Sequence, residues 1–380
     1  MLTLIRNARV YAPEPLGVCD VLLAGGKIAQ IAEQIDLSGD AVSIIDADEA
    51  ILAPGIVDVL THPCGGGGEG GFANRTAEVD FATFANAGVT TPVGALGTDS
   101  TGRSLDVLYA TTMQLRAMGL SPRMYTGAYR VPVPTMTGDV IRDLTHIDPV
   151  IGVGELAIAD HRGSQPSSEE LRRVAAETLT GGTLLGEGGV VFLHVGSGES
   201  RLALVREALS GSDLPPRVFF PTHCNRTPEL LAEAIEHAQQ GGYFDVTAST
   251  VPEFLAQGEV PVLDALAAAK DAGVADRITV SSDAGGSLPV YEGGQLTAVS
   301  RAEPGVFLDL LKTALNDGLE TTKHLIAALT RNPAKALNLN NKGRIAKGCD
   351  ADLLMLSHDS HGPEAVFCNG QSLLPVDAPV

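Results

Sequence analysis

The chain lacks the features that would place it in a membrane or outside a cell. Its 380 residues contain no uninterrupted apolar run of about eighteen residues, the length that a membrane-spanning helix needs. The N-terminus has no basic segment followed by an apolar one. We therefore expect a soluble protein that is neither exported nor membrane-bound.

Cysteine and basic residues are also scarce. The five cysteines are scattered and show no CxxC spacing, which indicates reduced thiols in a cytoplasm. Only 26 lysines and arginines stand against 46 aspartates and glutamates, so the net charge is −20, and no basic cluster occurs. Because nucleic-acid binding requires a basic face, we expect no nucleic-acid partner.

The middle of the chain alternates apolar segments with amphipathic ones. One strand is expected from residue 56, and seven more at residues 91–96, 123–126, 150–153, 190–193, 218–220, 244–247 and 277–280. Helices are expected at residues 168–179, 200–208, 228–239, 262–272 and 306–316. Eight strands with helical spacers predict an α/β fold of the TIM (β/α)8 barrel type. A doubly wound open sheet is the alternative, but no GxGxxG motif follows the first strand.

Both ends of the chain are expected to form short strands and turns. On the N-terminal side these are residues 2–5, 20–24, 27–31 and 43–46, with a Gly-Gly hairpin signal at residues 25–26. On the C-terminal side they are residues 343–345, 348–356 and 365–370. We predict a β-sandwich domain built from residues 1–52 and 343–380, flanking a barrel domain of residues 53–342.

Polar side chains follow the predicted strands. The first strand runs into His62 and then into a four-glycine turn, containing Gly67 and Gly68, that ends at Glu69. Later strands lead to Thr98, Tyr129, Glu155, Arg162, His194, His223, Arg226, Asp283 and Ser287. The active site of such a barrel lies at the carboxyl ends of its strands, so these groups should converge. Imidazole and carboxylate donors together suit a cation such as Zn²⁺.

Taken singly, each of these residues has an ordinary structural explanation. A histidine at a strand end can be a hydrogen-bonded loop residue, and Asp283 can cap a helix. Glu155 can form an ion pair, the arginines can be solvated surface charges, and the glycine run can be a flexible loop. It is the joint pattern that favours a metal site.

These segments resemble the amidohydrolase superfamily and, within it, the isoaspartyl (β-aspartyl) dipeptidases. The resemblance covers nearly the whole chain. It is carried by residues 7–14, 65–69, 96–100, 126–129, 158–162, 221–226, 281–283 and 348–353. The Gly-Glu loop, the Asp-His-Arg segment and the Thr-His-x-Asn-Arg segment are typical of the dipeptidase branch, whereas the last segment is found across the superfamily.

The resemblance implies a binuclear zinc centre held by an HxH pair, a carboxylated lysine, two further histidines and an aspartate. His62, His194, His223 and Asp283 match this set. Leu60 replaces the first histidine of HxH, and Glu155 stands in the place of the lysine, where its carboxylate has a similar two-oxygen geometry. We therefore expect one firmly bound Zn²⁺ at Glu155, His194 and His223, and a second that is weak or absent at His62, Glu155 and Asp283.

The resemblance also implies roles for the other residues. Asp283 would move the proton of a metal-activated water that attacks the isopeptide carbonyl, and Tyr129 would hydrogen-bond the developing oxyanion. Substrate binding would fall to Glu69, which holds the ammonium group, and to Gly67, Gly68, Thr98, Arg162, Arg226 and Ser287. The predicted substrate is a small dipeptide, β-Asp-X, including β-Asp-Arg from cyanophycin degradation, and the predicted assembly is a homo-oligomer.

Two alternatives remain open at this point. Leu60 favours a catalytically weakened homologue that binds β-aspartyl peptides or amino acids without efficient turnover. The other alternative is an amidohydrolase for another cyclic or N-acyl amide, such as a hydantoin. Glu69, Tyr129, Arg162, Arg226 and Asp283 favour the dipeptidase.

Overall fold

A parallel barrel forms the middle of the molecule. The computed structural model describes residues 2–292, 295–357 and 362–374. Strands β6 to β11 are hydrogen-bonded side by side in chain order, β12 pairs with β13, and a bridge between Thr61 and Ala284 brings the end of β13 back to β6. The strands are β6 (Ile56–Thr61), β7 (Val89–Gly94), β8 (Arg123–Thr126), β9 (Val150–Ile158), β10 (Val190–Val195), β11 (Phe219–Thr222), β12 (Phe244–Thr247) and β13 (Ile278–Ser281). The predicted barrel is confirmed, and the doubly wound open sheet is not formed.

The barrel strands are apolar because both of their faces are covered. Every residue of β6, β7 and β10 is buried, as expected for parallel strands with side chains inside and helices outside. Inside the barrel the Tyr125 and Phe192 rings stack with centroids 5.0 Å apart, and Phe220 meets Phe192 edge-on at 5.1 Å. Leu60 is fully buried in this same interior cluster.

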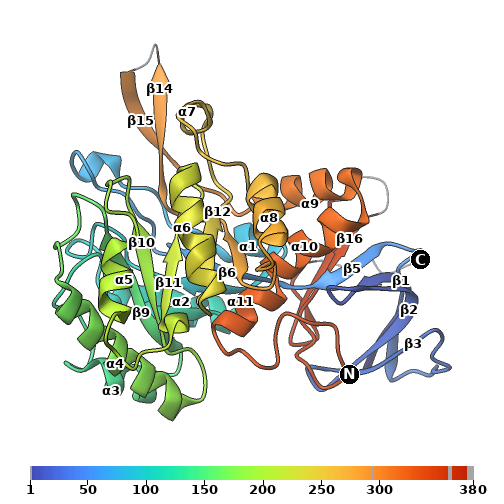
Figure 1. Cartoon of the computed structure of the whole chain (residues 1–380). Coiled ribbons are helices and arrows are strands. Elements are labelled where there is room, and N and C mark those ends of the chain that lie inside the picture. The colour runs from blue at the N-terminus through green and yellow to red at the C-terminus, as the bar shows by residue number, and fades with distance from the viewer. Residues whose placement is uncertain (1, 293–294, 358–361, 375–380) are drawn as a thin grey trace.

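Helices cover the outside of the barrel (Figure 1). Those at the predicted positions are α4 (Ser168–Leu185), α5 (Ala203–Leu209), α6 (Pro228–Gln239), α8 (Val262–Asp271) and α9 (Val306–Asp317). The prediction missed α1 (Phe81–Asn86), α2 (Leu105–Ala117), α3 (Val140–His146), α7 (Pro252–Ala256), α10 (Leu319–Leu329) and α11 (Arg331–Ala336), and two short 3-10 turns at Phe72–Asn74 and Pro216–Val218. A reciprocal capping box of Ser167 and Glu170 fixes the start of α4.

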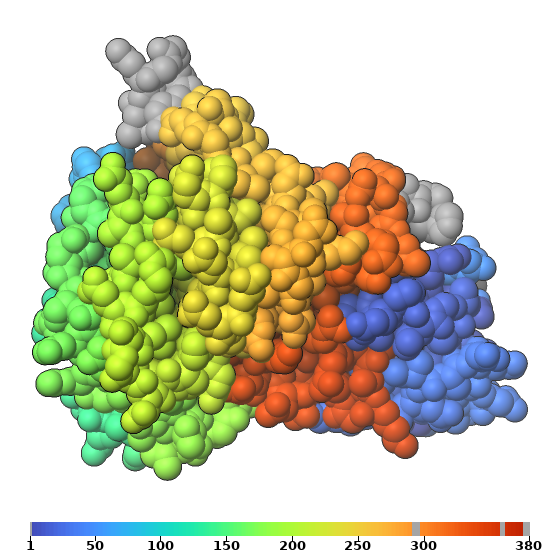
Figure 2. Space-filling view, in the orientation of Figure 1, coloured from blue at the N-terminus to red at the C-terminus, as the bar shows by residue number. Residues whose placement is uncertain are grey.

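Strands from both ends of the chain form one eight-stranded sheet. From the N-terminal side come β1 (Leu2–Tyr11), β2 (Pro15–Ala24), β3 (Lys27–Ala32), β4 (Val42–Asp46) and β5 (Ile51–Pro54), and from the C-terminal side β16 (Leu353–Leu356), β17 (Pro363–Cys368) and β18 (Gln371–Ser372). β5 lies between β1 and β16. Figure 2 shows the N-terminal and C-terminal surfaces together at one end of the molecule.

Residues 343–345, expected among the short strands and turns of the C-terminal side, form no strand. These residues form a bend and coil. The Nζ atom of the preceding Lys342 forms ion pairs with Oδ2 of Asp350 at 2.9 Å and with Oδ2 of Asp352 at 2.6 Å. The predicted domain boundaries near residues 52 and 343 remain a proposal. Residues 358–361 and 375–380 of the predicted C-terminal part lie outside the described residues.

A β-hairpin that the sequence analysis did not predict rises from the barrel. It consists of β14 (Ser287–Glu292) and β15 (Gln295–Arg301), and it projects away from the barrel end that carries Ser287 (Figure 1). Across the described ranges, none of the helices combines the length and the apolar content that crossing a bilayer requires.

Candidate metal centre and active site

The residues predicted for the site converge on one small cavity of about 70 Å³ at the carboxyl ends of the barrel strands. Its lining includes His62, Gly67, Glu69, Thr98, Tyr129, Arg162, His194, His223, Arg226, Asp283 and Ser287. Gly66, Gly97 and Gly286 complete the wall. Gly68 is not part of the lining, and a Cβ at this position would face Asp99. A larger groove of about 420 Å³, beside α3 and α4, contains none of the predicted site residues.

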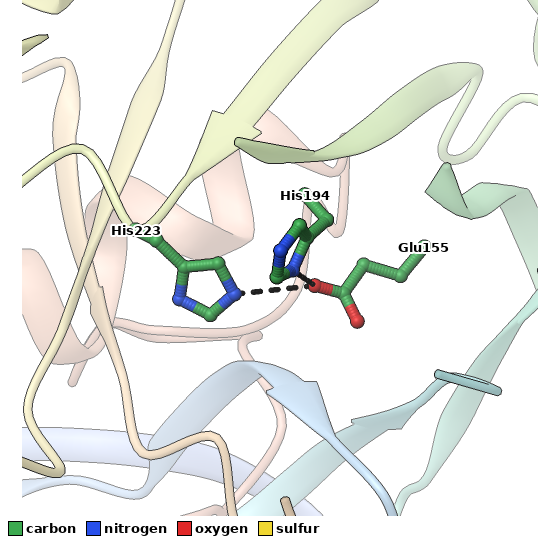
Figure 3. A group of neighbouring side chains, drawn as sticks. All are labelled: Glu155, His194 and His223. Atoms are coloured by element: carbon green, nitrogen blue, oxygen red, sulfur yellow. Dashed lines mark hydrogen bonds and ion pairs between the residues drawn. The ribbon is translucent and has the colours of Figure 1, made fainter. Parts of the chain in front are cut away.

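Glu155 meets His194 and His223, the two histidines of the cavity lining, in one cluster. Each offers one donor atom, and the three atoms lie within 4.8 Å of one another. The same carboxylate oxygen, Oε1 of Glu155, is 2.8 Å from Nδ1 of His194 and 3.2 Å from Nε2 of His223 (Figure 3). The two imidazole rings are 4.6 Å apart between centroids. All three side chains are buried, so this cluster is held in place by the barrel rather than by solvent-exposed loops.

The donor set fits a divalent cation. Two imidazole nitrogens and a carboxylate oxygen form the three-ligand arrangement of a catalytic zinc site. The second oxygen of Glu155, Oε2, is buried and has no hydrogen-bond partner among the described residues. A buried carboxylate oxygen that accepts no hydrogen bond is costly, and a bound cation would satisfy it. Zinc is one cation with these ligand preferences.

His62 and Asp283 form a second, poorer donor set beside the first. Nε2 of His62 lies 3.1 Å from Oδ1 of Asp283 and 3.5 Å from Oε2 of Glu155. Nδ1 of His62 donates to the Ala95 carbonyl at 3.0 Å, which leaves Nε2 as the atom facing the carboxylates. Leu60 adds no donor atom, because its side chain belongs to the apolar barrel interior.

Two of the histidines around Glu155, His62 and His223, differ in their protonation tendency. Burial lowers the pKa of His62, but the hydrogen bond with Asp283 and the charges of Asp283 and Glu155 outweigh it and raise the pKa to about 9. Burial, reinforced by the charge of Arg226, lowers the pKa of His223 to about 4. His223 is therefore neutral near pH 7, the form that binds a metal ion.

Two of the predicted ligands have strained backbones. The φ angles of His223 and Asp283 are 59° and 56°, in the left-handed region that side chains with a Cβ rarely adopt. Such strain persists where neighbouring contacts fix it, and it is concentrated at functional sites. Around Asp283, the Ser282 amide donates to Asp58 at 3.1 Å, and the Ala284 amide donates to Ser282 Oγ at 3.0 Å.

The predicted substrate-binding residues form a polar part of the cavity wall beside the histidines. Thr98 Oγ1 donates to Oε1 of Glu69 at 2.7 Å, and Arg162 Nη1 donates to the same oxygen at 3.0 Å. Burial raises the pKa of Glu69, but these two contacts prevail and keep it below its usual range. The Tyr129 hydroxyl lies 2.7 Å from Nδ1 of His194, so it reaches the point where the metal donors meet.

Arg226 differs from Arg162 in having no carboxylate partner. Its Nη1 donates to the Val195 carbonyl at 2.8 Å, and among the residues that the structure describes it takes part in no ion pair within 4.0 Å. Burial lowers its pKa, and the charge of Arg162 adds to this effect. A partly buried guanidinium at the cavity wall without a counter-ion is suited to bind an anionic group of a ligand.

The glycine loop is anchored from behind by a residue that the sequence analysis did not single out. Arg103 is buried, and it donates from Nε to the Cys64 carbonyl at 2.7 Å and from Nη2 to the Thr76 carbonyl at 2.8 Å. At Gly66, a Cβ would stand 3.0 Å from the Gly285 carbonyl. The loop therefore lies against the end of β13, and glycine is needed where the two backbones approach.

Asp58, Asp160 and Asp245 are buried carboxylates around the site that the prediction did not include. Asp245 accepts hydrogen bonds from Thr222, Thr279 and Ser281, each at 2.6 Å, inside the barrel. Asp58 and Asp245 each lie within an apolar strand segment, which is the one sequence signal that points to them. A polar residue in such a strand must find its partners inside the protein.

The comparisons with known proteins agree with this geometry. A model described as the amidohydrolase family matches residues 191–373. The structure of β-aspartyl dipeptidase from Fervidobacterium islandicum AW-1 in complex with β-Asp-Leu is 38% identical, covers 100% of this chain and 98% of its own, and superposes with a TM-score of 0.91. A second structure of the β-aspartyl dipeptidase from this organism is 37% identical with a TM-score of 0.89, covering 98% and 97%. This chain therefore belongs to the amidohydrolase family.

Within that family, the chain is similar over its whole length to a β-aspartyl dipeptidase. A more distant relative, the dihydroorotase of Streptomyces coelicolor, is 27% identical over 282 residues, which are 67% of this chain and 60% of the relative. The chain thus spans less than two thirds of that enzyme. D-hydantoinase, at 21% identity and a TM-score of 0.64, shares the fold.

Proposed function

We propose that this chain is a metal-dependent hydrolase of β-aspartyl dipeptides. The observation that carries the proposal is a single cavity in which two metal donors, His194 and His223, line the wall beside Glu69 and two arginines. The third donor, Glu155, contacts both histidines. The full-length similarity to a β-aspartyl dipeptidase that binds β-Asp-Leu supports the same substrate class.

The charges of the cavity suit a zwitterionic peptide. Glu69 offers a carboxylate to the α-ammonium group of the aspartyl residue, and Thr98 orients that carboxylate. Arg226, which lacks a counter-ion, and Arg162 offer guanidinium groups that match carboxylates in a bidentate manner. Ser287, Gly67 and the Gly66 backbone close the same wall.

The reaction we propose is hydrolysis of the isopeptide amide. A bound divalent cation would lower the pKa of water and polarise the scissile carbonyl. Asp283 faces the cavity and would accept the proton of the attacking water and return it to the leaving amine. The Tyr129 hydroxyl would donate a hydrogen bond to the oxygen on which negative charge develops.

We propose zinc as the metal, with one firmly bound ion at Glu155, His194 and His223. A second ion would rely on His62, Asp283 and the remaining Glu155 oxygen, and Leu60 deprives it of a fourth ligand. Loss of a ligand should reduce the occupancy of the second position by orders of magnitude, since even an outer-shell change costs about 10- to 100-fold in metal affinity.

Release of free aspartate from β-Asp-Leu tests the proposal. The purified protein would be stripped with a chelator and assayed with and without added Zn²⁺, and α-Asp-Leu would serve as the control peptide. We expect zinc-dependent release from the β-linked peptide alone. No release under either condition from a folded protein would overturn the proposal, and β-Asp-Arg in the same assay tests a link to cyanophycin degradation.

A second candidate is a weakened homologue that binds β-aspartyl peptides without efficient turnover. The observation in its favour is Leu60, a fully buried apolar side chain where the family likeness implies a ligand. Binding of β-Asp-Leu measured by calorimetry, together with turnover at the background rate, would select this candidate over the dipeptidase.

We also propose that the protein acts in the cytoplasm as a homo-oligomer. All five cysteines are free and buried, as suits a reducing compartment. The oligomer rests on the family resemblance, and sedimentation analysis of the purified chain tests it.

A further inference from the structure

Asp160 contacts a predicted metal ligand and a predicted substrate-binding residue at the same time. It lies two residues beyond the end of β9, and its side chain is 4% exposed. Oδ2 is 3.0 Å from Nε2 of His194 and 2.6 Å from Nη2 of Arg162. Oδ1 accepts from Nε of Arg162 at 2.9 Å and from the Arg162 amide at 2.8 Å. Both oxygens of this carboxylate are therefore fully used.

The contact with His194 fixes which ring nitrogen faces the metal donors. Nε2 of His194 lies 3.0 Å from Oδ2 of Asp160 and 3.1 Å from Nη2 of Arg162. Because an ionised carboxylate can only accept, a hydrogen bond between His194 and Asp160 requires the proton on Nε2. The opposite nitrogen, Nδ1, is left to face Oε1 of Glu155 at 2.8 Å. Histidine ligands of metal ions usually donate their second nitrogen to such a carboxylate, which sets both the tautomer and the ring orientation.

The contact with Arg162 fixes the guanidinium group that lines the substrate cavity. A bidentate arginine–carboxylate pair holds the plane of the guanidinium group as well as its position. Nη2 points at Asp160, whereas Nη1 extends to Glu69 at 3.0 Å. The guanidinium carbon also lies 5.5 Å from the centre of the Tyr129 ring. Asp160 therefore holds one end of a chain of contacts that runs across the cavity.

The backbone around Asp160 is itself anchored. The Asp160 carbonyl accepts from Gln165 Nε2 at 2.7 Å and from the Gly163 amide at 3.2 Å. The carbonyl of the preceding Ala159 accepts from the Gly198 amide at 2.8 Å, which ties this turn to the segment that follows β10. The turn that carries Asp160 and Arg162 is thus hydrogen-bonded to the segment after β10, the strand that carries His194, and these bonds fix the position of the carboxylate.

We propose that Asp160 is a positioning residue that orients His194 for the metal ion and Arg162 for the substrate carboxylate, so that metal affinity and substrate affinity depend on one side chain. The substrate half of this inference rests on the proposed function. The metal half rests only on the donor cluster of Glu155, His194 and His223.

The test compares Asp160→Asn, Asp160→Glu and Arg162→Gln with the wild-type chain. Asparagine loses the negative charge and places an NH2 group where one of the two oxygens accepts, so the set of contacts with His194 and Arg162 cannot be kept whole. We expect the affinity for Zn²⁺, measured by competition with a fluorescent chelator, to fall about 10- to 100-fold in Asp160→Asn. We expect the affinity for β-Asp-Leu, measured by calorimetry on the metal-free protein, to fall about 10-fold as well, the loss of about one charge-assisted hydrogen bond.

Arg162→Gln separates the two roles, since it should weaken β-Asp-Leu binding and leave the Zn²⁺ affinity within about threefold of wild type. Asp20→Asn is the matched control. Asp20 is equally buried and accepts two backbone hydrogen bonds in the terminal sheet, so this change should leave both affinities unaltered. If Asp160→Asn does not fold, Asp160→Glu keeps the charge but shifts the carboxylate, and it should lower both affinities.

Wild-type Zn²⁺ affinity in a folded Asp160 variant would overturn the inference. So would a loss of Zn²⁺ affinity while β-Asp-Leu binds as in the wild type. If the wild-type protein does not bind β-Asp-Leu at all, the substrate half falls together with the proposed function, whereas the Zn²⁺ measurements still decide the metal half.

Discussion

The carboxylate of Asp58 accepts a hydrogen bond from the backbone amide of Ser282, 3.1 Å away, at the closure of the barrel. A second contact joins Asp58 Oδ2 to Ser282 Oγ, and that hydroxyl accepts from the Ala284 amide. Asp58 belongs to the first barrel strand and Ser282 follows the last one. The side chain of Asp58 therefore fixes both chain neighbours of the strained Asp283 across the barrel closure: Ser282 directly, and Ala284 through the Ser282 hydroxyl.

Replacing Asp58 should disturb the position of Asp283, although Asp283 itself is unchanged. Asp58→Ala leaves the buried Ser282 amide and hydroxyl without their partner, which should cost about 1–3 kcal/mol in the free energy of unfolding. We expect kcat for β-Asp-Leu to fall more in Asp58→Ala than in Asp58→Asn, because asparagine retains an acceptor. Urea denaturation and steady-state kinetics on both variants check this. Equal kcat values in the two variants would contradict it.

Asp245 should make stability fall as the pH rises. Burial raises its pKa to about 8, despite hydrogen bonds from Ser281, Thr222 and Thr279. An unfolded aspartate has a pKa near 3.9, so between about pH 4 and pH 8 the folded chain holds a proton that the unfolded chain has lost. Raising the pH through this window therefore favours unfolding, by up to about 1.4 kcal/mol per pH unit.

The variant Asp245→Asn should lack this contribution. Chemical denaturation of the wild type and of Asp245→Asn at pH 5, 6, 7 and 8 measures the difference in slope. Asp20→Asn, whose site is remote from the barrel, serves as the control. Parallel stability curves for the wild type and Asp245→Asn would show that Asp245 does not titrate in this range.

Restoring a histidine at position 60 should increase metal binding. The wild-type chain is expected to hold about one Zn²⁺, and Leu60→His should bring the count closer to two, because the second donor set gains a ligand. Without metal, the imidazole would lie in apolar surroundings and lower the free energy of unfolding by about 1–3 kcal/mol. Elemental analysis after dialysis measures the count, with Leu60→Ile as the apolar control. About two ions in the wild type would refute the expectation.

Glu155→Gln should abolish tight metal binding while preserving the size and shape of the side chain. Burial raises the pKa of Glu155, but interactions with His194, His223 and His62 hold it well below its usual range, so the group is an anion. Glutamine removes that charge from the centre of the donor cluster, and we expect at least a 100-fold loss of Zn²⁺ affinity. A carboxylated lysine forms from lysine and carbon dioxide, whereas Glu155 carries its carboxylate without any modification. Added bicarbonate should therefore not change the metal loading of the wild type. A dependence on bicarbonate would contradict this role of Glu155.

The barrel could be predicted because its strands are buried on both faces. Such strands appear in the sequence as short apolar runs, and all eight were found. Several helices were missed: α3, for example, has only seven residues. The β14–β15 hairpin was missed although its strands flank Gly293-Gly294, a turn signal of the kind used at residues 25–26.

The site was predicted less completely than the barrel. Strand ends pointed to His62, His194 and His223, because the architecture brings all strand ends together. The sequence could not indicate that Asp160 contacts His194, since that contact joins a strand residue to a turn whose conformation depends on the whole fold. Nor could spacing distinguish Gly67, which lines the cavity, from Gly68, which faces Asp99.

The strand order of the terminal sheet has a consequence for synthesis on the ribosome. β5 pairs on one side with β1, which is made early, and on the other with β16, which is made only after the entire barrel. Until then the nascent chain carries an open strand edge, the kind of surface on which other chains can pair. Production of this protein should therefore be most vulnerable to aggregation when translation pauses between the last barrel helix and β16.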